Sequence, residues 1–182
     1  MTCIAAIAHE GKVFMGADRM TSAGNLKFGK TEPKVSIINS EMIVGICGYV
    51  RFGNIFNYHL SLKPYRKFHD EPGKEMDYLI THVAEEMRKK SAELSADRVD
   101  SSRQGSDSGV MIGLNGKIFS LGSDYSVCGH GEYFADGSGV GVALGSLYST
   151  GGKEPEERIR TAILAAAHHT AYVDDTIDIL SV

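Results

Sequence analysis

Residues 2–19 read TCIAAIAHEGKVFMGADR, two short apolar runs on either side of a turn. The first run, residues 2–8, is almost wholly apolar, as in a strand that is buried on both faces. The His-Glu-Gly-Lys that follows is a turn signal, and residues 13–18 form a second strand. The stretch therefore predicts an antiparallel hairpin, in which Asp18 at the end of one strand lies beside Thr2 at the start of the other.

More strands are predicted further along the chain. Two apolar runs flank an Asn-Ser-Glu turn. A second pair flanks Asn115-Gly116, and Asn-Gly between apolar runs is the strongest short hairpin signal. A final apolar run closes the sequence. These predicted strands are residues 34–38, 42–47, 110–114, 117–121 and 176–182.

Two helices are predicted within residues 50–97. The second of them has one apolar face with helical spacing. The members of that face are Met76, Leu79, Ile80, Val83 and Met87. A polar, serine-rich loop is expected at residues 97–107, before the strands resume.

A glycine-rich segment, residues 129–145, precedes another predicted helix, which runs from Pro155 to about Ala171. Proline suits a first helical turn, and acidic residues favour the positive end of the helix dipole. The apolar face of this helix is Ile159, Ala162, Ile163 and Ala166. Strands and helices thus occur in blocks, which favours a layered α+β fold in one domain, residues 1–182.

Composition and charge narrow the class of protein. The chain has 182 residues and a net charge of -4, and its Lys and Arg residues are scattered, so we expect no nucleic-acid partner. No apolar run reaches the ~18 residues of a membrane span, and the first nine residues lack the features of a signal peptide. Cys3, Cys47 and Cys128 lack metal-ligand spacing. We therefore expect a cytoplasmic protein with reduced, mostly buried cysteines, no metal and no cofactor.

Thr2 is the first candidate for chemistry. Threonine is small enough for methionine aminopeptidase to remove Met1, which would leave a free α-amino group on the residue that carries the hydroxyl. An α-amino group has a pKa of about 7.7–8.0, so it can act as a base near neutral pH. An adjacent base activates a hydroxyl as a nucleophile. Taken alone, a Met-Thr start is common, and this feature does not establish catalysis.

Four other residues fit a site around Thr2. A buried Lys34 would lower the effective pKa of the nucleophile, and Asp18 would hold that lysine. Gly48 follows an apolar strand and could bring a free backbone N–H to a ligand. Ser138 lies between glycines and could reach a neighbouring amine. Each has a plainer explanation: a surface salt bridge for Asp18 and Lys34, a strand-to-helix turn for Gly48, and a helix N-cap for Ser138.

Together these residues resemble the proteasome β-subunit and HslV family of N-terminal-nucleophile (Ntn) hydrolases. The resemblance covers essentially the whole chain, and the motifs keep the order and approximate intervals of the family. It is carried by Thr2, Gly16-Ala17-Asp18-Arg19, Lys34-Val35, Gly45-Ile46-Cys47-Gly48 and Gly137-Ser138-Gly139.

The resemblance implies a four-layer αββα sandwich and peptide hydrolysis through an acyl-enzyme on Thr2. It implies that Lys34 tunes the nucleophile, Asp18 orients Lys34, the Gly48 N–H stabilises the oxyanion, and Ser138 bonds near the Thr2 amine. It further implies polypeptide substrates, stacked homo-oligomeric rings and, as a possible partner, an ATP-dependent AAA+ unfoldase.

Two further assignments rest on the same resemblance. The substrate pocket would be lined by Thr21, Glu32, Ile46 and Val50, with Ser36 as a further candidate. Ile46 favours an apolar side chain and Glu32 a basic one, so the pattern selects neither.

The sequence departs from the family pattern near the C-terminus, where proteasome β-subunits carry an Asp and, three residues later, a Ser. Our alignment places Thr170 and Val173 there, and a shift of one or two residues would bring in His168 or His169. Two alternatives to a ring-forming threonine peptidase also remain open. One is a non-catalytic ring subunit of the same fold, and the other is a small-molecule Ntn amidase.

Overall fold

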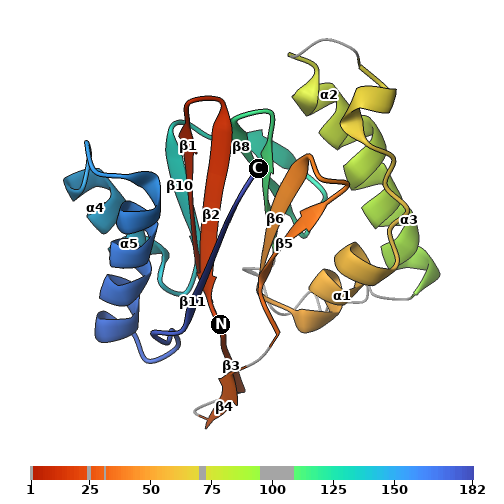
Figure 1. The fold of residues 1–182 in the computed structure, drawn as a ribbon. Helices are drawn as coiled ribbons and strands as arrows, with labels where there is room; N and C mark the ends of the chain where they lie inside the picture. Colours follow the sequence, from red (N-terminus) through yellow and green to blue (C-terminus); the bar gives the residue numbers. More distant parts are fainter. Residues whose placement is uncertain (1, 24–25, 31, 70–72, 95–108) are drawn as a thin grey trace.

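The computed structural model describes residues 2–23, 26–30, 32–69, 73–94 and 109–182. Two antiparallel sheets face each other, and helices cover the outer face of each (Figure 1). The predicted α+β fold with two antiparallel sheets between layers of helices is therefore confirmed.

The first sheet has four strands in the order β10-β1-β2-β11. Its central hairpin pairs Ile4 with Ala17, so the start of β1 and the end of β2 lie side by side, as the sequence predicts. The strands are β1 (Cys3–His9), β2 (Lys12–Asp18), β10 (Tyr133–Gly137) and β11 (Ile177–Ser181).

The second sheet has five strands in the order β5-β6-β7-β8-β9. The turn between β7 and β8 is the predicted Asn115-Gly116, and both residues have positive φ, 48° and 71°. That backbone matches the twist of a two-residue hairpin and explains the choice of residues. The strands are β5 (Val35–Ile38), β6 (Met42–Cys47), β7 (Gly109–Leu114), β8 (Lys117–Gly122) and β9 (Val127–Gly129).

Helices pack on the outer face of each sheet. The five-stranded sheet is covered by α1 (Val50–Tyr58), a 3-10 turn (Tyr65–Lys67) and one long helix. The parts of the long helix are α2 (Glu75–Tyr78), a π-helical segment (Leu79–Ala84) and α3 (Glu85–Glu93). The four-stranded sheet is covered by α4 (Val140–Ser149) and α5 (Pro155–His169).

Three apolar layers hold the sandwich together. One lies between the five-stranded sheet and its helices, and another lies under α4 and α5. The third lies between the two sheets and includes Ile4, Met15 and Ile43, each fully buried. β1 contributes Ile4 to the middle layer and Cys3 to the α5 side, as the period of two in a strand requires. An apolar β1 is thus explained by its place between two cores.

The predicted face of the long helix is partly wrong. Leu79, Val83 and Met87 are fully buried, but Met76 and Ile80 are 36% and 48% exposed. Glu75, one position before Met76, and Tyr78, two positions before Ile80, are buried instead. The π-helical turn is the physical reason, since its wider turn changes which residues share a face.

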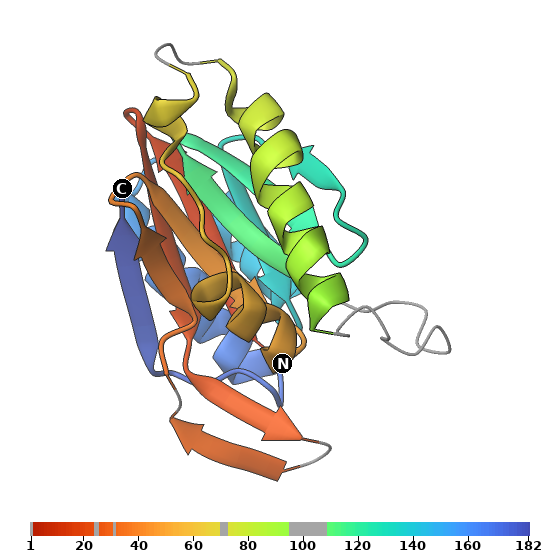
Figure 2. The same cartoon turned by 90° about the vertical axis from the view of Figure 1, so that its right-hand side faces the viewer.

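Several elements were not predicted. The projecting hairpin of β3 (Met20–Ala23) and β4 (Leu26–Lys30) forms a separate two-stranded sheet at the end of the sandwich (Figure 2). The glycine-rich segment contains β10 and the first part of α4. The predicted loop at residues 97–107 lies outside the described residues. Cys3 and Cys47 are buried and Cys128 is exposed, which agrees with the prediction of mostly buried cysteines.

Within the described ranges, no helix is long and apolar enough to cross a membrane. The same residues contain no group of three or more His, Cys, Asp or Glu side chains that could hold a metal ion.

Candidate active site

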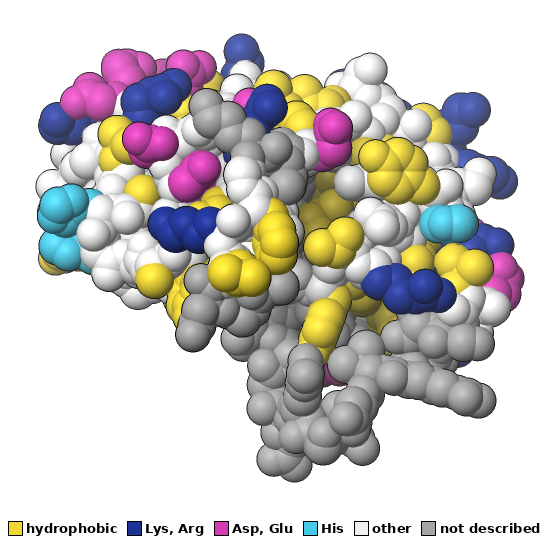
Figure 3. All heavy atoms as spheres, turned by 90° about the horizontal axis from the view of Figure 1, so that it is seen from below, with side chains coloured by type: hydrophobic (Ala, Val, Ile, Leu, Met, Phe, Trp, Pro, Cys, Tyr) yellow, Lys and Arg dark blue, Asp and Glu magenta, His cyan; other side chains and the backbone are white. Residues whose placement is uncertain are grey.

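The predicted site lies at the end of the sandwich where β1 begins and the β3–β4 hairpin projects (Figure 1). Seen from this end, the surface is hollowed near its centre, and apolar side chains border the hollow (Figure 3). Thr2 itself is buried, whereas Ser138 and Gly48 are exposed. A nucleophile at this position would thus lie at the bottom of the site rather than on its rim.

Asp18 is the central group of the site. It is fully buried at the end of β2, and its carboxylate accepts three hydrogen bonds. Oδ1 accepts the N–H of Cys3 at 2.8 Å and the ammonium of Lys34 at 3.0 Å. Oδ2 accepts the N–H of Met20 at 2.9 Å. One carboxylate oxygen therefore joins the Lys34 ammonium to the peptide bond that follows Thr2.

Lys34 reaches this carboxylate from the other sheet. It directly precedes β5, and its carbonyl accepts the N–H of Ile46 at 3.0 Å, which fixes the strand that carries it. Its side chain is only 12% exposed. Burial lowers the pKa of Lys34, and the negative charges of Asp18 and Asp174 partly offset this effect. The result is a desolvated ammonium held beside the start of β1.

Ser138 directly follows β10 and contacts Thr2. Its hydroxyl oxygen accepts the Thr2 N–H at 3.3 Å and donates to the Thr2 carbonyl at 3.2 Å. Gly137 has a φ of 91°, and a Cβ there would lie 2.3 Å from the Thr2 carbonyl oxygen. Only glycine lets the turn approach this closely. The N-cap of α4 is Gly139, so Ser138 serves the Thr2 contact rather than a helix cap.

Gly48 belongs to the turn that follows β6. It lies between β6 and α1 and has a φ of 87°, in the left-handed region that favours glycine. Its exposure gives a ligand access to this turn. The five predicted residues, Thr2, Asp18, Lys34, Gly48 and Ser138, thus come from five places in the sequence and lie at the same end of the sandwich.

Comparison with solved structures finds proteins of the same fold. BPH of Thiobacillus denitrificans in complex with epoxomicin aligns with a TM-score of 0.76 at 21% identity, over 100% of this chain and 98% of that chain. Another BPH structure from the same organism gives 0.75 at 18%, over 100% and 97%. Eukaryotic HslV from Trypanosoma brucei gives 0.67 at 16%, over 99% and 98%. No protein-family model and no curated protein sequence matches the chain.

The chain has the proteasome/HslV Ntn-hydrolase fold. The four-layer αββα sandwich that the sequence resemblance implied is therefore confirmed, over the full length of the chain. At these identities the likeness establishes the fold, and the chemistry rests on the residues of this chain.

The residues predicted to line a substrate pocket differ in their surroundings. Ile46 is half-buried and packs against Gly53 of α1, where a Cβ would lie 2.6 Å from the Ile46 Cγ2. Thr21 is half-buried on β3, as is Ser36 on β5. Val50 is exposed at the start of α1. The pocket assignment remains a prediction.

Glu32 is exposed and faces a cation of the protein itself. Its charge helps to raise the pKa of Arg19, although the larger cause is the hydrogen bonding of Arg19 to Asp178. That pair is bidentate, with 2.6 Å from Nε and 2.7 Å from Nη2. Because Glu32 already lies near the positive charge of Arg19, it has less negative charge to offer a basic side chain of a substrate.

Thr170 and Val173, which our alignment places at the Asp and Ser positions of proteasome β-subunits, follow directly on α5. The Thr170 hydroxyl donates to the carbonyl of Ala166 at the end of α5, and Val173 is buried in the apolar layer under α5. The alignment of these two residues with the family remains a prediction. Nearby, Asp174 contributes negative charge that raises the pKa of Lys34, after the larger effect of Asp18.

His168 and His169 are exposed at the end of α5, where their rings meet edge to face with centroids 4.7 Å apart. They are therefore a feature of the surface.

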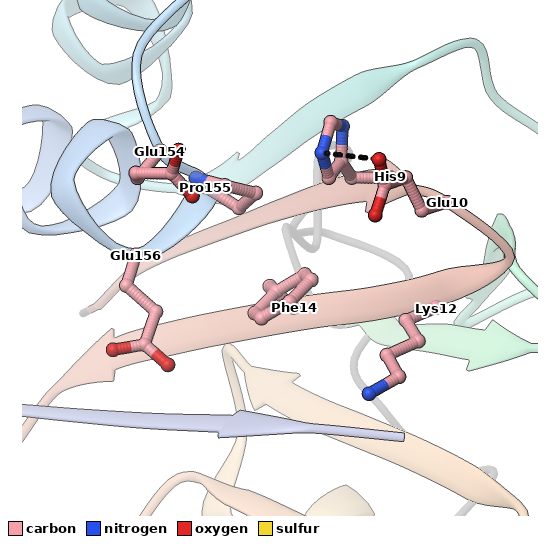
Figure 4. A pocket seen from close by; sticks show the side chains of 7 residues that line it. All are labelled: His9, Glu10, Lys12, Phe14, Glu154, Pro155 and Glu156. Carbon is pink, nitrogen blue, oxygen red and sulfur yellow. Dashed lines mark ion pairs between the residues drawn. The ribbon is translucent and has the colours of Figure 1, made fainter.

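A pocket of about 420 Å³ lies at the other end of β1 (Figure 4). Its lining is His9, Glu10, Lys12, Phe14, Glu154, Pro155 and Glu156. β1 has seven residues, and a strand rises about 3.3 Å per residue, so this pocket is roughly 20 Å from Thr2. It takes no part in the site described above.

Proposed function

We propose that this chain is a threonine-type endopeptidase that cleaves peptide bonds through an acyl-enzyme on Thr2. One observation carries the proposal: Oδ1 of buried Asp18 accepts both the Lys34 ammonium and the Cys3 N–H. A buried ion pair at the first peptide bond of the mature chain is costly, because desolvation of both charges opposes folding. Its presence at this position therefore favours a functional role. Activation of an N-terminal hydroxyl is the role that this position supports.

The reaction begins once Met1 has been removed. The Thr2 α-amine, directly or through a water molecule, accepts the proton of the Thr2 hydroxyl, whose oxygen attacks the carbonyl carbon of the substrate. The Lys34 ammonium favours this step because a nearby positive charge stabilises the developing alkoxide. Asp18 keeps Lys34 in place, and Asp174 adds negative charge that favours the protonated lysine.

The tetrahedral intermediate then collapses. Its oxyanion accepts the N–H of Gly48, a fixed donor in the position where charge develops. The protonated α-amine gives its proton to the leaving nitrogen, the C–N bond breaks, and the acyl group remains as an ester on Thr2. Water attacks the ester with the amine again as base, and the carboxylate product leaves. Ser138 holds the Thr2 backbone through both of its hydrogen bonds.

The proposal extends to assembly. HslV from Trypanosoma brucei has the same fold, and we propose that this chain likewise forms stacked homo-oligomeric rings that enclose the sites. Such a chamber would receive unfolded polypeptide, with an AAA+ unfoldase as the partner, in the cytoplasm. The proposed ring assembly, unfoldase partner and cytoplasmic location all rest on the similarity of the fold.

The test is the intact mass of the purified protein before and after incubation with epoxomicin, the ligand of the Thiobacillus denitrificans BPH structure. We expect loss of Met1 and one adduct that maps to Thr2. Thr2→Ala is the control and should form no adduct. A processed chain that forms no adduct and hydrolyses no peptide would contradict the proposal.

The same preparation separates the alternatives. A non-catalytic ring subunit would elute as a large assembly without an adduct. A small-molecule amidase would form the adduct yet elute as a small oligomer and leave peptide substrates intact.

A further inference from the structure

Asp136 lies between the two sheets at the site, and no role has yet been given to it. It occupies β10 opposite Ile4 of β1, next to the Cys3–Gly137 pair. Successive side chains of a strand point to opposite faces. Ala135 lies in the layer under α5, whereas Phe134 packs against the layer between the sheets, so Asp136 faces the other sheet with Phe134.

The carboxylate of Asp136 bridges the sheets. Its Oδ2 lies 3.1 Å from the Cys47 thiol, which donates to it, and its Oδ1 accepts the N–H of Gly137 at 2.6 Å. A Cβ on Gly109, the partner of Cys47 in the register of β6 and β7, would lie 3.4 Å from Oδ2. The carboxylate thus rests on the end of the five-stranded sheet while it belongs to the four-stranded one.

Asp136 is half-buried and forms no ion pair with the part of the chain that the structure describes. A carboxylate removed from water without a cation is unfavourable unless hydrogen bonds compensate it. Its bonds here go to a thiol and to a backbone N–H. Its charge also reaches the start of β1, where burial and the charges of Asp18 and Asp136 raise the pKa of the Cys3 thiol to about 12, against the effect of Lys34.

The two bonded residues each precede a residue of the site. Cys47 precedes Gly48, the oxyanion donor of the proposed mechanism, and Gly137 precedes Ser138, which holds Thr2. We propose that Asp136 is a positioning residue of the peptidase: it sets the distance between the Gly48 turn on one sheet and the Thr2–Ser138 contact on the other. This inference rests on the proposed function.

The test compares Asp136→Asn and Asp136→Ala with the wild type in hydrolysis of a fluorogenic peptide. A misplaced oxyanion donor weakens the transition state more than substrate binding. Misplacement by about 1 Å can cost roughly 100-fold in rate. We therefore expect kcat to fall by about 10-fold in Asp136→Asn and about 100-fold in Asp136→Ala, with KM within about twofold of the wild type.

The matched control is Asp124→Asn. Asp124 is exposed and also accepts two hydrogen bonds, from the backbone and the hydroxyl of Ser126, but in a turn after β8. It should keep the wild-type kcat. A peptide boronate, which mimics the tetrahedral intermediate, should lose affinity for the Asp136 variants by the same factor as kcat falls, while the thermal midpoint and the size of the assembly stay unchanged.

Cys47 supplies a second pair of variants if the Asp136 variants do not fold. Cys47→Ser keeps a donor for Asp136 and should lose less of kcat than Cys47→Ala. If Asp136→Ala had the same kcat as an active wild type, this inference would be wrong and the proposed function would stand. The inference would also be wrong if Cys47→Ser and Cys47→Ala lost equal amounts of kcat, or if kcat fell only in parallel with the thermal midpoint. A wild type without activity or epoxomicin adduct would overturn the proposed function and this inference with it.

Discussion

Lys34 and Asp18 form a buried ion pair across the two sheets, with 3.0 Å between Nζ and Oδ1. Asp18 is fully buried and Lys34 is nearly so, which distinguishes this pair from the surface pairs of the same protein. Exposed pairs contribute little to stability, and buried pairs often cost more in desolvation than they return. The pair therefore points to chemistry rather than to stability.

Lys34→Ala should lower kcat/KM by at least about 100-fold, because it removes the cation that stabilises the developing alkoxide. The measurement is hydrolysis of a fluorogenic peptide, on protein whose near-UV circular dichroism matches that of the wild type. Lys153→Ala is the control, since Lys153 pairs with Glu157 on the surface. Wild-type turnover in Lys34→Ala would remove this residue from the mechanism.

The same pair predicts the alkaline limb of the pH profile. Burial lowers the pKa of Lys34 below its ordinary value of 10.5, an effect that Asp18 and Asp174 partly offset. The ammonium is therefore lost at a lower pH than in an exposed lysine, and activity should fall as the pH rises through this lowered pKa. Asp174→Asn should move the fall to still lower pH, since it removes a charge that favours the ammonium. A profile that is unchanged in Asp174→Asn would contradict this electrostatic role.

Thr2→Ala should abolish hydrolysis and epoxomicin labelling while it leaves the assembly intact, because only the hydroxyl and a methyl group are removed. Thr2→Ser keeps the nucleophile and should remain active, within roughly 10-fold of the wild type. Intact mass and size-exclusion chromatography read out both variants. If Thr2→Ala still hydrolysed peptide at the wild-type rate, the nucleophile would be another residue.

Sequence alone predicted the elements with clear local signals. The β1–β2 hairpin was predicted from two apolar runs around a turn. The β7–β8 turn was predicted from Asn115-Gly116, two residues that readily adopt the positive φ values found there. α5 begins at Pro155, as a first-turn proline predicts. The approach of Asp18 to Thr2 also follows from hairpin register, without reference to the other sheet.

What sequence could not supply depends on contacts between distant segments. The π-helical turn exposes Met76 and Ile80, and no local pattern marks it. Asp174 follows α5 after an irregular segment, so residue counting does not reveal that its charge acts on Lys34. Asp136 meets Cys47 only because β10 and β6 belong to facing sheets. Tertiary packing decides all three cases.

Gly137→Ala should destroy the site. The added Cβ would lie 2.3 Å from the Thr2 carbonyl oxygen, and a φ of 91° is strained for alanine, so we expect a loss of at least about 3 kcal/mol in the free energy of unfolding, together with the loss of activity. Gly141→Ala is the matched control, because Gly141 lies in α4 with open space around it. It should stabilise the protein by about 0.5–1 kcal/mol. Urea denaturation checks both, and a tolerated Gly137→Ala would show that Thr2 need not be held so closely.

Glu75 carries a pH-dependent contribution to stability. It is only 2% exposed, and the burial alone would raise its pKa. Hydrogen bonds from Lys117, the Gly73 N–H and Asn115 outweigh that effect and lower the pKa of Glu75 from 4.5 to about 2. These bonds fasten the start of α2 to the β7–β8 hairpin. Because the folded-state pKa is depressed, the stabilisation is present above pH 4.5 and is lost as the pH falls towards 2.

A pKa lowered from 4.5 to about 2 corresponds to roughly 3 kcal/mol, and because Lys117 is 52% exposed, solvent screening reduces the expected contribution to about 2 kcal/mol. Glu75→Gln should therefore lower the free energy of unfolding by about 2 kcal/mol at pH 7. At pH 2 and below the wild type and the variant should nearly coincide, since protonation of Glu75 removes the same charge. Glu10→Gln, at a side chain that is 85% exposed, should match the wild type at both pH values. A difference between wild type and Glu75→Gln that stayed constant from pH 7 to pH 2 would show that Glu75 acts through shape and hydrogen bonding rather than through its charge.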